Sequence, residues 1–303
     1  MRIVSSSVLG WQIAGARLAV LMVIVVQALE LRAGWSQESV QPRINEEFLE
    51  QERIYRSRGA EGRRIYTTDR GLSRYADLLP STFCDGLARL GSSDRWLDIG
   101  AGQAQAILDY YLPENAAAPA ENCRGSGSKA RAVAISIEDR RTENWKQQVA
   151  GLSDDRIRYL YGKRLRQYSP EELGKFQIIT DVYGGFTYTE DLSQFVGKVL
   201  GLLEVGGSFY TLATGVHLED GKDKLGTLYL TELEDAFGRA LKMCSWLKKI
   251  SCVQVTCESK TDLKRPTQLI KIEKICSDTS VPSMKLVEFE AGYPPARCFQ
   301  LDP

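Results

Sequence analysis

An aspartate and two glycines stand together at the end of a short apolar run, in RWLDIGAGQAQAIL at residues 95–108. Glycines let the backbone turn tightly and let a ligand approach it closely. The free N–H groups of a helix that opens just after the turn face such a ligand. Asp98 precedes Gly100 and Gly102, and its charge suits a ligand with an ammonium group better than one with a pyrophosphate. The segment predicts a ligand site at a strand-to-helix joint.

A dinucleotide site is one alternative for this turn. Its fingerprint is G-x-G-x-x-G/A, and after Gly100 and Gly102 the third small residue is replaced by Gln105. A bulky glutamine obstructs the close contact between helix and strand that the third glycine allows. The spacing therefore disfavours a nicotinamide dinucleotide.

An alternation of strand and helix patterns surrounds the turn and must position it. Short apolar runs rich in branched residues predict strands at 95–99, 130–137, 156–161, 176–183 and 207–213. Helical patterns lie between them, at 104–112, 141–152, 169–175 and 191–203. Strict alternation implies a parallel sheet with helices on both faces. Ligands of such sheets bind at the carboxyl ends of the strands, and Asp98 lies at one of these ends.

Three segments interrupt or follow the alternation. Residues 113–130 are rich in Ala, Pro, Gly and Ser and predict a surface loop insertion. Apolar residues recur at helical spacing over 230–244 and predict an amphipathic helix. The runs 250–257 and 267–276 predict an antiparallel hairpin. The predicted fold is therefore α/β: a doubly wound, Rossmann-like, mostly parallel seven-stranded sheet that ends in an antiparallel hairpin, with helices on both faces.

The N-terminus carries a basic and then an apolar segment. Arg2 and Arg17 precede an apolar run at 18–29, which is shorter than the ~20 residues of a spanning helix and has the length of a secretory signal's core. Ala33 is a candidate cleavage position. We expect residues 1–33 to be a signal peptide or a membrane anchor, so that the protein is exported or membrane-associated. A buried helix and a start assigned too far upstream, which would leave a cytoplasmic protein, are the alternatives.

The overall charge favours neither nucleic acid nor anionic lipid, because Lys plus Arg and Asp plus Glu both total 39. Arginines and tyrosines do concentrate in a helical segment within residues 34–91. Guanidinium groups and aromatic rings suit phosphate or nucleic acid. Nearby glutamates favour the other interpretation, a solvated and neutralised face.

The seven cysteines show no C-x-x-C spacing, which disfavours a zinc site or a thioredoxin-like redox site. We interpret them as buried thiols that act as small apolar side chains. An odd number is compatible with disulfides only if one thiol is left over. Cys252 and Cys257 lie on one predicted strand at odd spacing, so their side chains should point to opposite faces and share no ligand site.

The turn after the first strand resembles motif I of the class I S-adenosylmethionine-dependent methyltransferases, in which an acidic residue is followed by three glycines at alternate positions. Five consecutive residues match the first part of the motif: Asp98, Ile99, Gly100, Ala101 and Gly102. Ala104 stands in place of the third glycine. The resemblance implies that these residues bind S-adenosylmethionine.

The resemblance covers about residues 92–276 and implies roles for two more acidic residues. In the family an acidic residue after the second strand binds the ribose hydroxyls, and Glu138 has that place, with Asp139 beside it. The fourth strand usually ends in an aspartate that faces the methionine part or the substrate, and this place belongs to Asp181. Lys163 departs from the family's pattern, because it cannot accept the hydrogen bond of the adenine amine.

Methyl transfer from a sulfonium is an in-line displacement, which needs an aligned acceptor more than a catalytic triad. His217, the one histidine, follows the fifth predicted strand and is a candidate base, with an exposed loop residue as the alternative. Tyr183 is a second candidate, for contact with the substrate or for packing over the cofactor. We expect residues 214–249 to shape the acceptor pocket as a lid, and residues 277–303 to form a tail.

The sequence as a whole predicts an S-adenosylmethionine-dependent methyltransferase of an unidentified acceptor, with a small molecule favoured. The alternative is a noncatalytic binding protein with the same fold, exported or anchored in a membrane.

Overall fold

The computed structural model describes residues 70–116, 120, 123, 130–152, 156–222, 227–290, 292 and 294–303. All of them belong to one compact unit, Gly62–Pro303. The apolar run at 18–29, the cleavage candidate Ala33 and most of the arginine-rich segment lie outside the described residues. In the described part of the chain, the helices are too short or too polar to cross a membrane.

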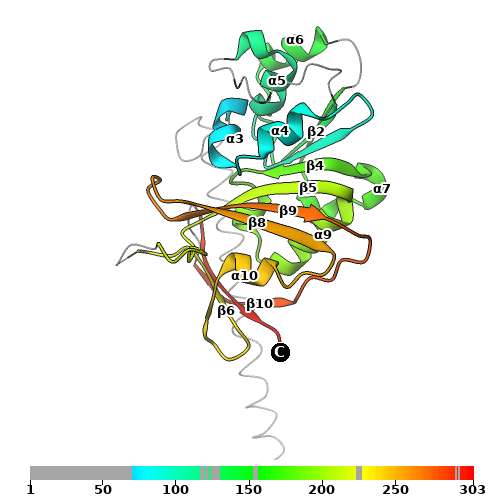
Figure 1. Cartoon of the computed structure of the whole chain (residues 1–303). Coiled ribbons are helices and arrows are strands. Elements are labelled where there is room, and N and C mark those ends of the chain that lie inside the picture. The colour runs from blue at the N-terminus through cyan, green and yellow to red at the C-terminus, as the bar shows by residue number, and fades with distance from the viewer. Residues whose placement is uncertain are drawn as a thin grey trace, which may run out of the picture. The chain divides into compact units, whose positions relative to one another are not determined.

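A seven-stranded sheet with the order β3-β2-β1-β4-β5-β9-β8 lies at the centre (Figure 1). Five of its strands run parallel: β1 (Arg95–Ile99), β2 (Arg131–Ser136), β3 (Ile157–Tyr161), β4 (Phe176–Asp181) and β5 (Leu203–Thr214). β9 (Thr267–Lys274) is antiparallel to β5, and β8 (Val253–Lys260) is antiparallel to β9. The predicted mostly parallel sheet with its antiparallel hairpin is confirmed.

Helices connect the strands and cover both faces of this sheet. They are α3 (Leu72–Leu78), α4 (Phe83–Ala88), α5 (Gln105–Tyr111), α6 (Glu143–Ala150), α7 (Pro170–Leu173), α8 (Gly185–Tyr188), α9 (Leu192–Leu202) and α10 (Met243–Leu247). Because side chains alternate along a strand, Trp96 packs in the cluster that includes α3, α4 and α5, and Leu97 in the cluster that includes α8 and α9. Two apolar cores therefore hold the sheet between two layers.

A second sheet has the order β10-β11-β6-β7. Its strands are β6 (Thr231–Glu234), β7 (Ala240–Leu241), β10 (Met284–Glu290) and β11 (Ala296–Leu301). β11 runs parallel to β6 and antiparallel to β10. Residues expected as a C-terminal tail thus pair with residues expected as part of a lid. Leu233, Met284 and Phe299 join the same apolar cluster as α9, so the two sheets share a core.

The amphipathic helix predicted over residues 230–244 is wrong. These residues form β6, β7 and the start of the short α10. The Asp235 carboxylate accepts the N–H groups of Phe237 and Arg239, which fixes a turn there, and Phe237 is 83% exposed. β6 forms a strand because it pairs with β11, which lies more than 60 positions further along the chain. The local spacing of apolar residues carries no information about so distant a partner.

Three disulfides join six of the cysteines: Cys84–Cys123, Cys244–Cys257 and Cys252–Cys276. Cys298 is free. The interpretation as buried free thiols is therefore wrong for six residues, because the fold brings together cysteines that are 13 to 39 positions apart. Cys252 and Cys257 have separate partners, but Cys252 precedes β8 (Val253–Lys260), so the prediction that both lie on one strand is wrong. Disulfides of this number are typical of proteins that fold in oxidising compartments.

Candidate functional site

The glycine turn follows β1 and is held against two other segments. Gly100 has φ +71° and Gly102 has φ +57°, in the left-handed region that glycine adopts without strain. The N–H groups of Gly100 and Ala101 donate to the carbonyl oxygen of Ile135 at 2.9 and 3.0 Å, which ties the turn to β2. A Cβ atom on Gly100 would lie 2.4 Å from the Cα of Gly184. Only glycine permits this close approach of the turn to the loop after β4.

Asp98 lies beneath the turn and is fully buried. Its carboxylate accepts hydrogen bonds from the Tyr75 hydroxyl at 2.9 and 3.0 Å and from the Thr180 hydroxyl at 2.8 Å. Thr180 in turn accepts the indole N–H of Trp96 at 2.8 Å. Burial raises the pKa of Asp98 to about 7, against the opposing effect of the two hydroxyls. A helix and a neighbouring strand therefore fix the orientation of Asp98.

Asp181 lies on the adjacent strand, where it pairs in register with Ile99. Its carboxylate accepts the N–H groups of Gly184 at 2.9 Å and Phe186 at 3.0 Å. Burial raises its pKa to about 7 as well, although these N–H groups stabilise the charged form. Both oxygens thus hold the loop that packs on the glycine turn. Asp181 lies where the resemblance places it, and its described contacts are with the chain's own backbone.

Arg70 brings a positive charge to these two aspartates. Its guanidinium donates to the carbonyl oxygen of Val182 at 2.9 Å and lies 5.3 Å from the ring centroid of Tyr183. Its charge lowers the pKa of both Asp98 and Asp181, against the larger effect of burial. Tyr183 has φ +55°, and a non-glycine residue in this region carries about 1–3 kcal/mol of strain. The residue singled out in the sequence is thus strained and stacked beside the site.

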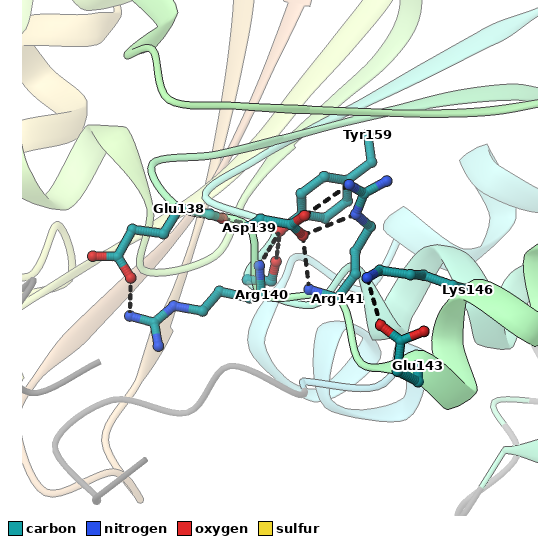
Figure 2. A network of polar contacts seen from close by, with 8 residues as sticks. Glu138, Asp139, Arg140, Arg141, Glu143, Lys146 and Tyr159 are labelled. Carbon is teal, nitrogen blue, oxygen red and sulfur yellow. Dashed lines mark hydrogen bonds and ion pairs between the residues drawn. The ribbon is translucent and has the colours of Figure 1, made fainter. Parts of the chain in front are cut away.

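Glu138 and Asp139 lie in the loop after β2, each paired with an arginine (Figure 2). Glu138 Oε2 is 2.5 Å from Nη2 of Arg140, and the Glu138 side chain is 26% exposed. The Asp139 carboxylate accepts Nε and Nη2 of Arg141 at 2.9 and 2.8 Å, which lowers its pKa. Figure 2 shows the two carboxylates directed to different sides of the loop. They therefore cannot serve one ligand group together.

Tyr159 joins this acidic loop to the glycine turn. From β3, its hydroxyl contacts the carbonyl oxygen of Gly102 and that of Glu138, the second at 3.3 Å. The same oxygen accepts the N–H of Arg140 at 3.3 Å. The guanidinium of Arg141 lies 4.8 Å from the Tyr159 ring (Figure 2). One side chain thus connects the ends of β1 and β2.

The remaining candidates make their described contacts away from this cluster. His217 is half-buried after β5 and stacks on Tyr229, with ring centroids 3.7 Å apart. Lys163 forms an ion pair with Glu172 at 3.2 Å. The structure thus brings Asp98, Asp181 and Tyr183 together with the turn, while His217 and Lys163 have other neighbours.

Sequence reasoning missed four residues of the site: Arg70, Tyr75, Tyr159 and Thr180. Arg70 and Tyr75 belong to a segment interpreted as a solvated charged face, yet the Tyr75 side chain is 1% exposed. Thr180 directly precedes Asp181 on a strand, so its side chain must point to the opposite face, toward Asp98. That alternation was the one signal available for it.

The chain matches no family model and no curated protein. It is similar in structure to methyltransferases. One is a geranyl diphosphate methyltransferase (15% identity, TM-score 0.33, 48% of this chain and 47% of that chain). Another is phosphoethanolamine N-methyltransferase 2 of Haemonchus contortus (11% identity, TM-score 0.40, 65% of this chain and 53% of that chain). A third is precorrin-6y C5,15-methyltransferase of Geobacter metallireducens (16% identity, TM-score 0.33, 64% of this chain and 86% of that chain).

The chain spans about half the length of the first two of these structures. The fold rests on the strand order of the chain itself, which is that of the Rossmann-like methyltransferase fold. The three neighbours named here are methyltransferases of different small molecules by their names, so no acceptor follows from them.

Proposed function

We propose that the chain is an S-adenosylmethionine-dependent methyltransferase that binds its cofactor at the carboxyl ends of β1 and β2. The observation that carries this proposal is the connection of the Gly100–Gly102 turn to the loop of Glu138 through the Tyr159 hydroxyl. A tight backbone turn beside a partly exposed carboxylate offers a ligand two kinds of contact. The turn fits the amino-acid end of the cofactor, and the carboxylate fits its ribose hydroxyls.

The residues present fit such a ligand. The Glu138 side chain is partly exposed, and one of its carboxylate oxygens is paired to Arg140, so that the other can accept from a hydroxyl group. Asp98 is fully buried and acts through its negative charge, which would stabilise an ammonium group placed at the turn. Bound S-adenosylmethionine would supply a methyl group on a sulfonium. The chain's own residues would orient the ligand.

The domain assignment follows from the same proposal. We propose residues 92–276 as the methyltransferase-like part of the compact unit, with an insertion at 113–130 and with a lid at 214–249 that includes β6 and β7 of the second sheet. The acceptor is an unidentified small molecule. Tyr183 and His217 are the candidates for contact with it, and Tyr183 is supported by its place in the loop that packs on the glycine turn.

Calorimetric titration of the whole, oxidised chain with S-adenosylmethionine and S-adenosylhomocysteine tests the cofactor site. We expect binding by the parent chain. Glu138→Gln should weaken it roughly tenfold or more, because a hydrogen bond to a charged group contributes about 1.5–3 kcal/mol. Asp139→Asn is the matched control and should leave affinity unchanged, since Asp139 faces Arg141. Absence of binding by the parent chain would overturn the proposal.

A noncatalytic protein of the same fold is the second candidate, and the three disulfides favour it. They support export or membrane anchoring through residues 1–33, with 18–29 as the apolar segment, into an oxidising compartment that lacks a cytosolic cofactor. Alkylation of cysteines in intact cells, followed by mass spectrometry, separates the two candidates. Six protected cysteines together with no cofactor binding would establish this second function. Six free cysteines would exclude it.

A further inference from the structure

Arg297 is a buried cation on β11, in the second sheet, and its contacts reach the loop after β4. The residue is 5% exposed. Its Nη1 donates to the carbonyl oxygens of Phe186 at 3.2 Å and Thr189 at 2.6 Å, and its Nη2 donates to the Thr231 hydroxyl at 2.9 Å. The guanidinium thus joins β11 and β6 to the short helix α8.

Asp181 holds the same loop from the opposite side. It accepts the N–H of Phe186, while Arg297 donates to the carbonyl oxygen of Phe186. The N–H of Phe186 thus bonds a buried carboxyl group, and its carbonyl oxygen bonds a buried guanidinium group. The placement of the carboxyl group at the N–H groups and of the guanidinium at the carbonyl groups is favourable. The N–H groups at the start of a helical turn attract an anion, and the carbonyl groups at its end attract a cation. Removing either charge leaves the other buried with less compensation.

The position of this loop decides the shape of the glycine turn. A Cβ atom on Gly184 would lie 2.4 Å from the carbonyl oxygen of Ile99, so the loop packs against the end of β1 without room for a side chain. A shift of the loop would open that contact. Whatever fixes Phe186 therefore also fixes Gly184 against Gly100.

We propose that Arg297 is a positioning residue of the cofactor site, through which the second sheet holds the loop of residues 182–189 against the glycine turn. Its effect on cofactor affinity rests on the function proposed above. Its effect on the loop does not, so the two can fail separately.

Lys274 provides a matched control. It is also 5% exposed, and its ammonium group likewise donates to two carbonyl oxygens, of Leu200 at 2.9 Å and Leu203 at 3.2 Å. These partners end α9 and begin β5, at the end of the sheet away from the glycine turn. Lys274→Met and Arg297→Met both remove a buried cation that contacts carbonyl groups. Only Arg297→Met should change the site.

The experiment measures amide hydrogen exchange of Gly184 and Phe186 in the whole oxidised chain, together with calorimetric affinity for S-adenosylhomocysteine. In Arg297→Met we expect both amides to exchange about tenfold faster and affinity to fall about tenfold, the equivalent of one charged hydrogen bond. Lys274→Met should leave the exchange rates of the two amides and the affinity within about twofold of those of the parent. We expect this even if its melting temperature falls as far as that of Arg297→Met.

Arg297→Lys should rescue part of the loss, because an ammonium group can reach one carbonyl but lacks the fork that reaches two. If Arg297→Met does not fold, Arg297→Lys alone tests the proposal. Its loop amides should then exchange faster than those of the parent and more slowly than those of an open loop. Equal exchange of the loop amides in the Arg297 and Lys274 variants would overturn the proposal. Faster loop exchange in Arg297→Met, together with a parent chain that binds no cofactor, would support the role of Arg297 and contradict the proposed function.

Discussion

Asp98 on β1 pairs with Thr180 on β4, and Asp181 is the next residue of β4, so the two carboxylates lie on opposite faces of the sheet. Both are closed to solvent, and burial dominates their electrostatics. Each accepts at least two hydrogen bonds, which favour the charged form. Their pKa values nevertheless rise to about 7, because desolvation outweighs those bonds and the charge of Arg70. A cation bound near Asp98 would favour its charged form and so lower its pKa.

The stability of the folded chain should depend on the ionisation of Asp98. The pKa of about 7 in the folded chain exceeds the ordinary 3.8, so between these values the folded chain holds a proton that the unfolded chain has lost. The free energy of unfolding therefore falls as pH rises from about 4 to about 7, by at most about 1.4 kcal/mol per pH unit for one carboxyl group. Asp98→Asn should remove this contribution.

Urea unfolding at several pH values between 4 and 7 measures this contribution. The free energy of unfolding of Asp98→Asn minus that of the parent should increase with pH. Asp262→Asn, at an exposed position, should give a difference that is independent of pH. A constant difference for Asp98→Asn would show that Asp98 has an ordinary pKa in the folded chain.

Tyr75 should contribute to stability through its hydroxyl group. Tyr75→Phe removes the donor to a fully buried carboxylate and leaves the ring in place, so we expect a loss of about 1–3 kcal/mol in the free energy of unfolding. Tyr161→Phe is the control, because Tyr161 is 52% exposed, and it should change stability by about 0.5 kcal/mol or less. Equal losses in chemical denaturation would contradict the role assigned to Tyr75.

Part of the candidate site is readable in the sequence and part is not. Asp98, Gly100 and Gly102 form a local pattern, because a strand that turns at once into a helix needs flexible backbone and the turn lies within a few residues. Tyr75 and Arg70 reach the site from a preceding segment, and only the packing of α3 on the sheet brings them there. No local spacing contains that information.

At the level of elements, the glycine turn after β1 and the loop after β4 pack closely at the proposed cofactor site. Gly184→Ala would place a Cβ atom 2.4 Å from a backbone oxygen and 3.0 Å from the Cα of Gly100, where neither neighbour is a flexible side chain. We expect a loss of about 1–3 kcal/mol or more in stability, as in other overpacked sites. Cofactor affinity should fall with it.

Gly201→Ala is the matched control for this substitution. Gly201 lies in α9, and a Cβ atom there meets nothing within 4 Å. Alanine is favoured over glycine in a helix by about 0.5–1 kcal/mol, so this variant should be at least as stable as the parent. Calorimetry of the two variants measures their melting temperatures and their cofactor affinities. A Gly184→Ala protein with the stability and affinity of the parent would contradict the close approach of the loops.

The elements of the main sheet were predictable, whereas those of the second sheet were not. β1, β2 and β4 are mostly buried apolar runs, each followed by a helix, so the pattern of each is contained in about ten residues. β6 alternates buried Thr231 and Leu233 with exposed Glu232, but four residues are too few to outweigh a helical period that continues to Cys244. Its partner β11 lies in a segment without a strong pattern of its own.

For the whole molecule, the disulfides connect segments that the sheets leave loosely joined. Cys84–Cys123 spans 39 positions and links α4 to the insertion, while Cys244–Cys257 spans 13. By the chain-entropy argument, removing the first pair should cost about 3–4 kcal/mol and removing the second about 3 kcal/mol. Cys298→Ala, which breaks no disulfide, should cost about 1 kcal/mol or less.

Thermal unfolding of the double alanine variants, with and without a reductant, tests this order. The reductant should lower the melting temperature of the parent chain and of Cys298→Ala, and each double variant should be less sensitive to it. A parent chain with the same melting temperature in reductant would show that the disulfides do not contribute to its stability.

The parallel pairing of β11 with β6 also sets an order of events during synthesis. Thr231 and Arg297 are 66 positions apart, so β6 emerges from the ribosome well before the strand that must lie beside it. In that interval the nascent chain can complete all seven strands of the main sheet, since β9 ends at Lys274. The loop after β4 would then be held by Asp181 and Arg70 but would lack the contacts of Arg297. We therefore expect a nascent chain to acquire its sheet first and its ligand-binding edge only when Arg297 arrives, which delays ligand binding until almost the whole of the described chain has been made.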